Sequence, residues 1–80
     1  MSKLKILSAK EIIKIFESFG FIVVGQKGSH IKLERQIKNS KQTLTVPNHG
    51  EIDRGTVGAI YRQALRYIPE RELGECFYTK

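Results

Sequence analysis

The chain has 80 residues, which is enough for one small domain and too few for a second hydrophobic core. Its single cysteine, Cys76, excludes an internal disulfide, and no Cys and His residues have the spacing of a zinc site. No stretch approaches the roughly 20 apolar residues of a membrane span or forms the apolar run of a signal peptide. We therefore expect one domain over residues 1–80 in the reducing cytoplasm, with no metal, cofactor or membrane partner.

Lys and Arg outnumber Asp and Glu by 14 to 8, which gives a net charge of +6. Most of the excess lies between residues 26 and 46, whose charged residues are Lys27, Lys32, Arg35, Lys38, Lys41 and Glu34. A concentrated basic region favours a phosphate backbone or an acidic protein as partner. A charged surface that only keeps the protein in solution is the alternative interpretation.

The first predicted element is a helix from about Ala9 to Phe19. Ser8 is a suitable N-cap, and Glu11 completes a capping box with it. Apolar residues at helical spacing form one stripe, which consists of Ile12, Ile15, Phe16 and Phe19. Gly20 follows as the left-handed residue that ends the helix.

Three strands are predicted next, over residues 21–24, 29–35 and 42–46, with a polar loop over 36–41. The connections are too short for a crossover helix, so the strands should form an antiparallel meander. Strand alternation gives the sheet one apolar face, which consists of Ile31, Leu33, Leu44 and Val46. His30, Lys32 and Glu34 point to the opposite face.

A second helix is predicted from its N-cap Asp53 to Ile68, with a helical apolar stripe on one side. Pro69 ends this helix or begins a short turn, and we expect the tail over about 74–80 to be loose. Two amphipathic helices need one apolar surface to cover, so both should pack on the same face of the sheet. The prediction is an α+β domain, α-β-β-β-α, whose open sheet face carries His30.

His30 is the candidate catalytic residue, because histidine takes and gives protons near neutral pH and this one follows a turn on the open face. Lys32 shares that face, and Lys27 and the amides of Gly28 and Ser29 lie at the turn, where they could hold a phosphate. The alternative is that His30 is a surface residue without a function.

The second histidine, His49, follows the third strand in a turn. It could supply the complementary acid or base, or it could simply be a turn residue bonded to nearby backbone. Which proton His30 handles is open, and so is whether it acts alone.

Three motifs together resemble the HicA toxins. They are Gly28-Ser29-His30, the segment Thr45-Val46-Pro47-Asn48-His49-Gly50-Glu51, and Gly55-Thr56-Val57 leading into Ile60-Tyr61-Arg62-Gln63-Ala64. The resemblance covers about residues 8–68. It implies a toxin of a toxin–antitoxin pair, with a fold similar to the double-stranded-RNA-binding domain and RNase activity on messenger RNA. It also implies that His30 is the catalytic residue and that a HicB antitoxin covers the His30 face.

Two functions follow from this pattern. The first is a metal-independent endoribonuclease that cleaves single-stranded mRNA with one histidine and basic phosphate-binding residues. The second is a non-catalytic RNA-binding or adaptor module, since one fold hosts both functions. A binder gains little from one imidazole among lysines, whereas an acid–base catalyst needs one, so the sequence favours the enzyme. A purely protein-binding subunit is a third, weaker alternative.

Overall fold

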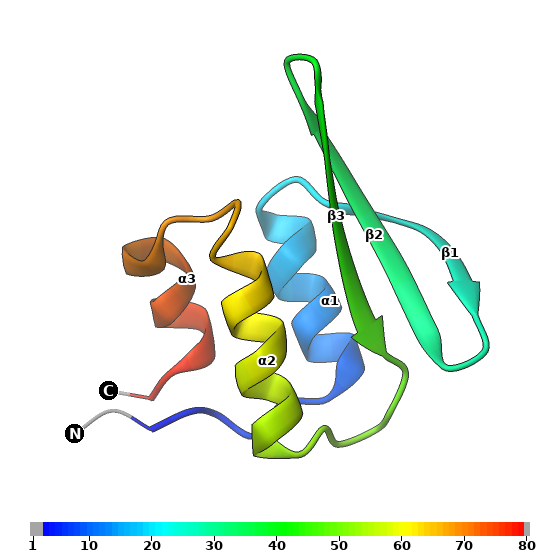
Figure 1. The fold of residues 1–80 in the computed structure, drawn as a ribbon. Helices are drawn as coiled ribbons and strands as arrows, with labels where there is room; N and C mark the ends of the chain where they lie inside the picture. The colour runs from blue at the N-terminus through cyan, green and yellow to red at the C-terminus, as the bar shows by residue number, and fades with distance from the viewer. Residues whose placement is uncertain (1–2, 80) are drawn as a thin grey trace.

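The computed structural model describes residues 3–79. Its elements are α1 (Ala9–Ser18), β1 (Ile22–Lys27), β2 (His30–Ile37), β3 (Ser40–Pro47), α2 (Arg54–Ala64) and α3 (Glu70–Phe77). The strands form one antiparallel sheet in the order β1-β2-β3, and the helices lie on one side of it (Figure 1). The predicted α+β fold, like that of the double-stranded-RNA-binding domain, is confirmed, with one helix more than expected. No helix within residues 3–79 is long and apolar enough to cross a membrane.

The predicted capping box starts α1. The Ser8 hydroxyl accepts a hydrogen bond from the Glu11 amide at 3.2 Å, and the Glu11 carboxylate accepts one from the Ser8 amide at 2.8 Å. The helix then buries Ile12 and Phe16 completely. Gly20 follows it with φ of 97°, a conformation that glycine adopts without strain.

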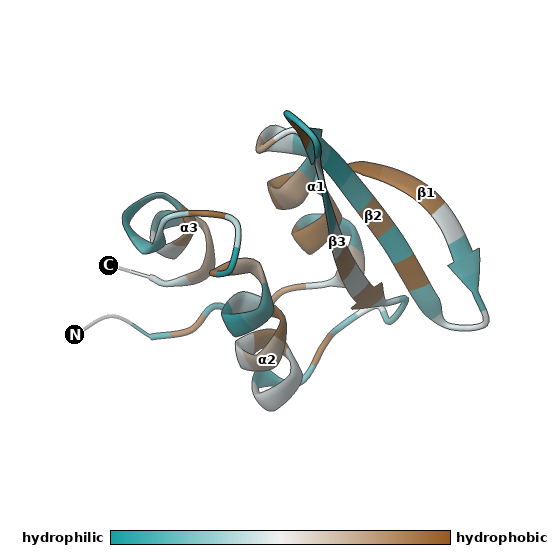
Figure 2. Ribbon diagram, turned by 45° about the horizontal axis from the view of Figure 1, so that its top comes forward, coloured by the Kyte–Doolittle hydropathy of each residue, from teal (hydrophilic) through white to brown (hydrophobic). Residues whose placement is uncertain are grey.

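The core lies between the helices and one face of the sheet. All four residues predicted for that face are buried: Ile31, Leu33, Leu44 and Val46. Apolar and polar residues alternate along β2 (Figure 2), so the opposite face of the strand is polar and open. Both predicted helices, α1 and α2, contact β3, which confirms that they share one face.

The second hairpin is longer than predicted. Residues 36–41 do not form a polar loop, because Gln36 pairs with Lys41 and Ile37 pairs with Ser40 in the β2–β3 ladder. Only Lys38 and Asn39 remain as a turn, and Lys38 has the positive φ of 55° that two-residue hairpin turns require. Backbone pairing with the neighbouring strand extends β2 and β3 here despite the polar side chains.

The expectation of a loose tail is wrong for residues 74–79. The second predicted helix ends at Ala64, and α3 follows Pro69 and buries Leu73 and Phe77 completely. The two ends of the chain also pair, since the Phe77 carbonyl accepts a hydrogen bond from the Lys5 amide at 2.7 Å. Two apolar residues four apart are too short a pattern to predict a helix, and the pairing partner is distant in sequence. Lys80 lies outside the described residues.

The N-cap of α2 makes the stability of the fold depend on pH. The Asp53 carboxylate accepts hydrogen bonds from the Thr56 hydroxyl at 2.7 Å and from the Thr56 amide at 3.0 Å. These two bonds lower the pKa of the Asp53 carboxyl from its ordinary value of 3.8, and the bond from the hydroxyl has the larger effect. A carboxyl with a lowered pKa in the folded chain stabilises the fold above its unfolded pKa, and this stabilisation is lost as the pH falls through the folded pKa.

We expect Asp53→Ala to be less stable than the parent chain at pH 7, with a smaller difference below about pH 4. Urea unfolding of both proteins at pH 7 and at about pH 3 measures the difference in their free energies of unfolding. A difference that grows on acidification would contradict the role of the ionised cap.

Candidate active site

The β1–β2 turn fixes the position of His30. Gly28 has φ of 60°, which favours glycine, and the Gln26 side-chain amide donates to the Gly28 carbonyl at 2.9 Å. Lys27 and His30 close the turn as directly opposite residues of the two strands. Such residues share a face and have Cβ atoms about 4.5–5.5 Å apart, so the lysine stem lies beside the imidazole.

His30 lines a hollow on the open face of the sheet. The hollow has a volume of about 570 Å³, and its lining residues are Val24, Gly25, Gln26, Lys27, His30, Lys32, Glu34 and Thr45. A β-bulge shifts the β1 register between Val23 and Gly25, and Gly25 then lies opposite Lys32. A Cβ on Gly25 would meet no atom within 4 Å, so no other part of the protein covers the strand at this position.

The structure brings three of the predicted site residues together. Lys27, His30 and Lys32 all line the hollow, with the imidazole between two lysines on one polar face. Gly28 and Ser29 lie in the adjoining turn and do not line it. The sequence did not indicate Val24 or Gln26, because only the cross-strand register and the bulge place them there. Alternation with Leu44 and Val46 places Thr45 on the open face but suggests no role for it.

Glu34 is a further member of this face. Its carboxylate lies 3.5 Å from the Lys32 ammonium and 3.8 Å from the Lys41 ammonium. Alternation placed Glu34 on the open face but suggested no role for it. A phosphate that approached Lys32 or Lys41 would have to displace this carboxylate.

Neutralising Glu34 should therefore strengthen the binding of a polyanion such as RNA to this face. A solvent-exposed ion pair is worth up to about 1 kcal/mol, so we expect Glu34→Gln to tighten binding of a single-stranded RNA by up to about fivefold at low salt. Fluorescence anisotropy at several salt concentrations measures it. Glu17→Gln, an exposed change on α1 with the same effect on net charge, is the control. Equal tightening by both variants would mean that net charge, and not release of Lys32, causes the effect.

Arg35 does not belong to the basic surface, although it contributes to the charge excess of the segment. Its guanidinium donates to the Phe19 carbonyl at 2.8 Å, to the Gln42 side chain at 2.9 Å and to the Tyr67 carbonyl at 3.0 Å. It also lies 4.7 Å from the centre of the Phe21 ring. These contacts are on the helix side of the sheet, so Arg35 cannot reach a ligand in the hollow.

His49 lies at the same end of the sheet as His30 but outside the hollow lining. His30 pairs with Pro47, and the Asn48 amide donates to the Ser29 carbonyl at 2.6 Å. The His49 carbonyl accepts a hydrogen bond from the Ala9 amide at 3.0 Å, which fixes its backbone. Within residues 3–79, no hydrogen bond involves either imidazole.

Comparison with known proteins identifies the family of this chain. The family model described as "HicA toxin of bacterial toxin-antitoxin" matches residues 9–65, more than half of the chain. The chain belongs to the HicA toxin family. The HicA match includes both histidines and the whole lining of the hollow, whereas α3 lies outside it. Membership of a toxin–antitoxin family implies an antitoxin partner.

No curated protein and no solved structure gave a match to this HicA chain. Among the residues that the structure describes, no three His, Cys, Asp or Glu side chains are grouped so as to hold a metal ion.

Proposed function

We propose that this HicA toxin is a metal-independent endoribonuclease that cleaves single-stranded mRNA in the cytoplasm. His30 is the proposed catalytic residue, and a HicB-like antitoxin that covers the His30 face is the proposed inhibitor. The observation that carries the proposal is the hollow on the open sheet face, where one exposed imidazole lies between two lysines in a chain of a toxin family. An acid–base group beside two cations is what cleavage of a phosphodiester requires.

The proposed reaction uses the RNA's own ribose. The 2′-oxygen attacks the adjacent phosphorus, a 2′,3′-cyclic phosphate forms, and the bond from phosphorus to the 5′-oxygen breaks. His30 either removes the proton of the 2′-hydroxyl or donates one to the departing 5′-oxygen. Lys27 and Lys32 stabilise the additional negative charge at phosphorus, and the Gly28 and Ser29 amides add donors at the rim.

His49 is the candidate for the complementary proton transfer, because its backbone lies at the same end of the sheet as His30. The pH–rate profile of His49→Ala distinguishes the two possibilities. Loss of one limb of the profile would identify His49 as the partner, whereas an unchanged profile would leave His30 as the single histidine involved.

The test of the enzyme class is incubation of purified protein with a long single-stranded RNA in excess chelator. We expect shorter RNA products and no cleavage of DNA of the same sequence, because DNA lacks the attacking 2′-hydroxyl. RNA that is bound but stays intact, with or without added divalent ions, would favour the non-catalytic RNA-binding module. Cleavage that appears only after divalent ions are restored would contradict the metal-independent mechanism.

A further inference from the structure

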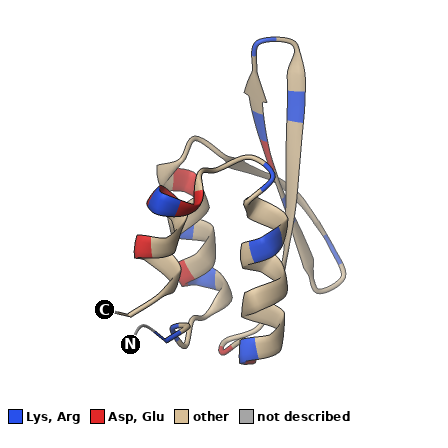
Figure 3. Cartoon of the chain, turned by 60° about the vertical axis from the view of Figure 1, so that its left-hand side comes forward, with Lys and Arg blue, Asp and Glu red and all other residues tan. Residues whose placement is uncertain are grey.

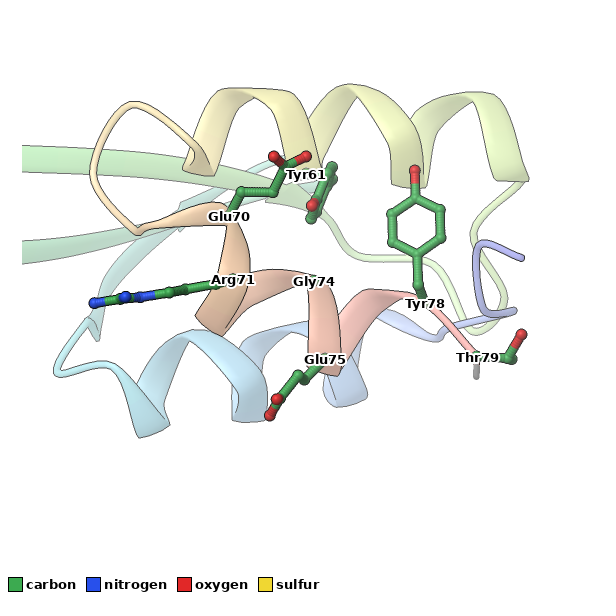
Figure 4. Close-up of a pocket in the computed structure, with 7 residues that line it drawn as sticks. All are labelled: Tyr61, Glu70, Arg71, Gly74, Glu75, Tyr78 and Thr79. Atoms are coloured by element: carbon green, nitrogen blue, oxygen red, sulfur yellow. The ribbon is translucent and has the colours of Figure 1, made fainter. Parts of the chain in front are cut away.

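A second hollow is lined by residues of α2, α3 and the segment that follows α3 (Figure 4). Its volume is about 410 Å³, and its lining residues are Tyr61, Glu70, Arg71, Gly74, Glu75, Tyr78 and Thr79. This volume is within the range of pockets that bind small ligands. The α3 residues that form it lie beyond the HicA match, so the family does not account for it.

The hydroxyl of Tyr61 opens into this hollow beside the Glu70 carboxylate. The residue as a whole is only 6% exposed. Within residues 3–79, the only side-chain partner of its hydroxyl is Glu70, to which it donates. A Cβ on Gly74 would lie 3.4 Å from that hydroxyl, so the glycine leaves the space in front of it free. A ligand that enters the hollow therefore meets a phenol oxygen that can still accept a hydrogen bond.

Aromatic rings form one wall of the hollow and are held in place. The Tyr61 and Tyr78 rings meet edge to face, with centroids 5.3 Å apart. The Tyr78 amide donates to the Gly74 carbonyl at 2.9 Å, and the Thr79 amide donates to the Lys3 carbonyl at 2.7 Å. Faces of fixed tyrosine rings attract cations.

Acidic side chains that form no ion pair within residues 3–79 lie beside this wall. Glu70 lies close to Tyr61 (Figure 4). Burial has the largest effect on the pKa of the Tyr61 phenol and raises it, and the negative charge of Glu70 and its hydrogen bond with the hydroxyl raise it further. Neither Glu70 nor Glu75 forms an ion pair within residues 3–79, and the Arg71 side chain points away from the two tyrosines (Figure 4). Acidic residues gather on α3 (Figure 3), although the whole chain carries a net charge of +6.

We propose that the α2–α3 hollow binds a cationic group carried on an aliphatic stem, such as the guanidinium of an arginine side chain. Tyr78 offers a ring surface to the stem and the cation, Glu70 pairs with the charge, and the Tyr61 oxygen accepts an N–H hydrogen bond. The ligand is either a free amine or a basic side chain of a partner protein. This site is independent of the proposed cleavage of RNA at His30.

The test is an NMR titration of the full ¹⁵N-labelled chain with three probes. They are agmatine, an acetylated Gly-Arg-Gly amide, and the same peptide with neutral citrulline in place of arginine. We expect saturable shifts of the Gly74, Tyr78 and Thr79 amides with the two cationic probes alone. If the arginine peptide binds more tightly than agmatine, the ligand is a protein side chain. If agmatine binds as tightly as the peptide or more tightly, the ligand is a free amine. No saturation below about 20 mM, or an equal response to citrulline, would overturn the proposal.

Two variants of α3 distinguish binding in the hollow from a general attraction of cations to acidic residues. Glu70→Gln and Glu72→Gln remove the same charge from the first turn of α3, but only Glu70 lines the hollow. We expect Glu70→Gln to weaken agmatine binding at least tenfold and Glu72→Gln to change it less than twofold. Equal losses in the two variants would overturn the proposal. Thermal unfolding of both variants checks that α3 remains folded.

Discussion

Replacement of His30 by alanine is expected to lower the rate of RNA cleavage by about 10²–10⁴-fold, the range that one general acid or base contributes. The side chain is exposed and forms no hydrogen bond within residues 3–79, so the free energy of unfolding should change by less than about 0.5 kcal/mol. Lys27 and Lys32 remain, so RNA affinity should change little. Single-turnover cleavage, fluorescence anisotropy and urea unfolding measure the three quantities separately.

Gln36→Ala is the matched control for this variant. Gln36 lies on the same strand as His30 and is exposed, but it does not line the hollow. Its cleavage rate should stay within about twofold of the parent rate, because surface substitutions away from a site have small effects. A His30→Ala protein that cleaves at the parent rate, or that loses affinity as much as rate, would show that His30 is not an acid–base catalyst.

Replacement of Arg35 by alanine is expected to destabilise the fold by about 3 kcal/mol without removing any residue of the hollow. The change removes three hydrogen bonds to a charged group and leaves the carbonyls of Phe19 and Tyr67 without their partner. It also removes the cation from the Phe21 ring. For a domain of this size, such a loss corresponds to a fall in Tm of roughly 15 °C.

Urea and thermal unfolding test this expectation, with Arg66→Ala as a control that removes an exposed arginine. Arg35→Lys should recover little of the stability, because one ammonium cannot reproduce the three-way geometry of the guanidinium. Equal midpoints for Arg35→Ala and Arg66→Ala would mean that the Arg35 contacts contribute little.

Local patterns predict the parts of this fold that depend on neighbouring residues. The capping box at Ser8 and the alternation of Ile31 and Leu33 with His30 need only a few consecutive residues, and both were confirmed. The same alternation places Arg35 on the apolar side with Leu33, which is a signal that it is not part of the open basic face. Its partners Phe19 and Tyr67 are 16 and 32 residues away, and no local pattern indicates them.

The hollow at His30 was only partly predictable, for a similar reason. Strand alternation puts His30 and Lys32 on one face, but the lining from β1 depends on the bulge between Val23 and Gly25. A one-residue change of register would move the β1 side chains to the other face. The length of β1 and the pairing of Lys27 with His30 therefore had to come from the structure.

The most direct test of ribose-hydroxyl chemistry at His30 uses one RNA oligonucleotide that the wild-type protein cleaves in chelator. A second version carries a single 2′-deoxy nucleotide at the cleaved position, and mass spectrometry identifies the product ends. We predict a 2′,3′-cyclic phosphate on the parent product and no cleavage at the deoxy position. Cleavage of both versions at the same rate would contradict attack by the 2′-hydroxyl and, with it, the proposed role of His30.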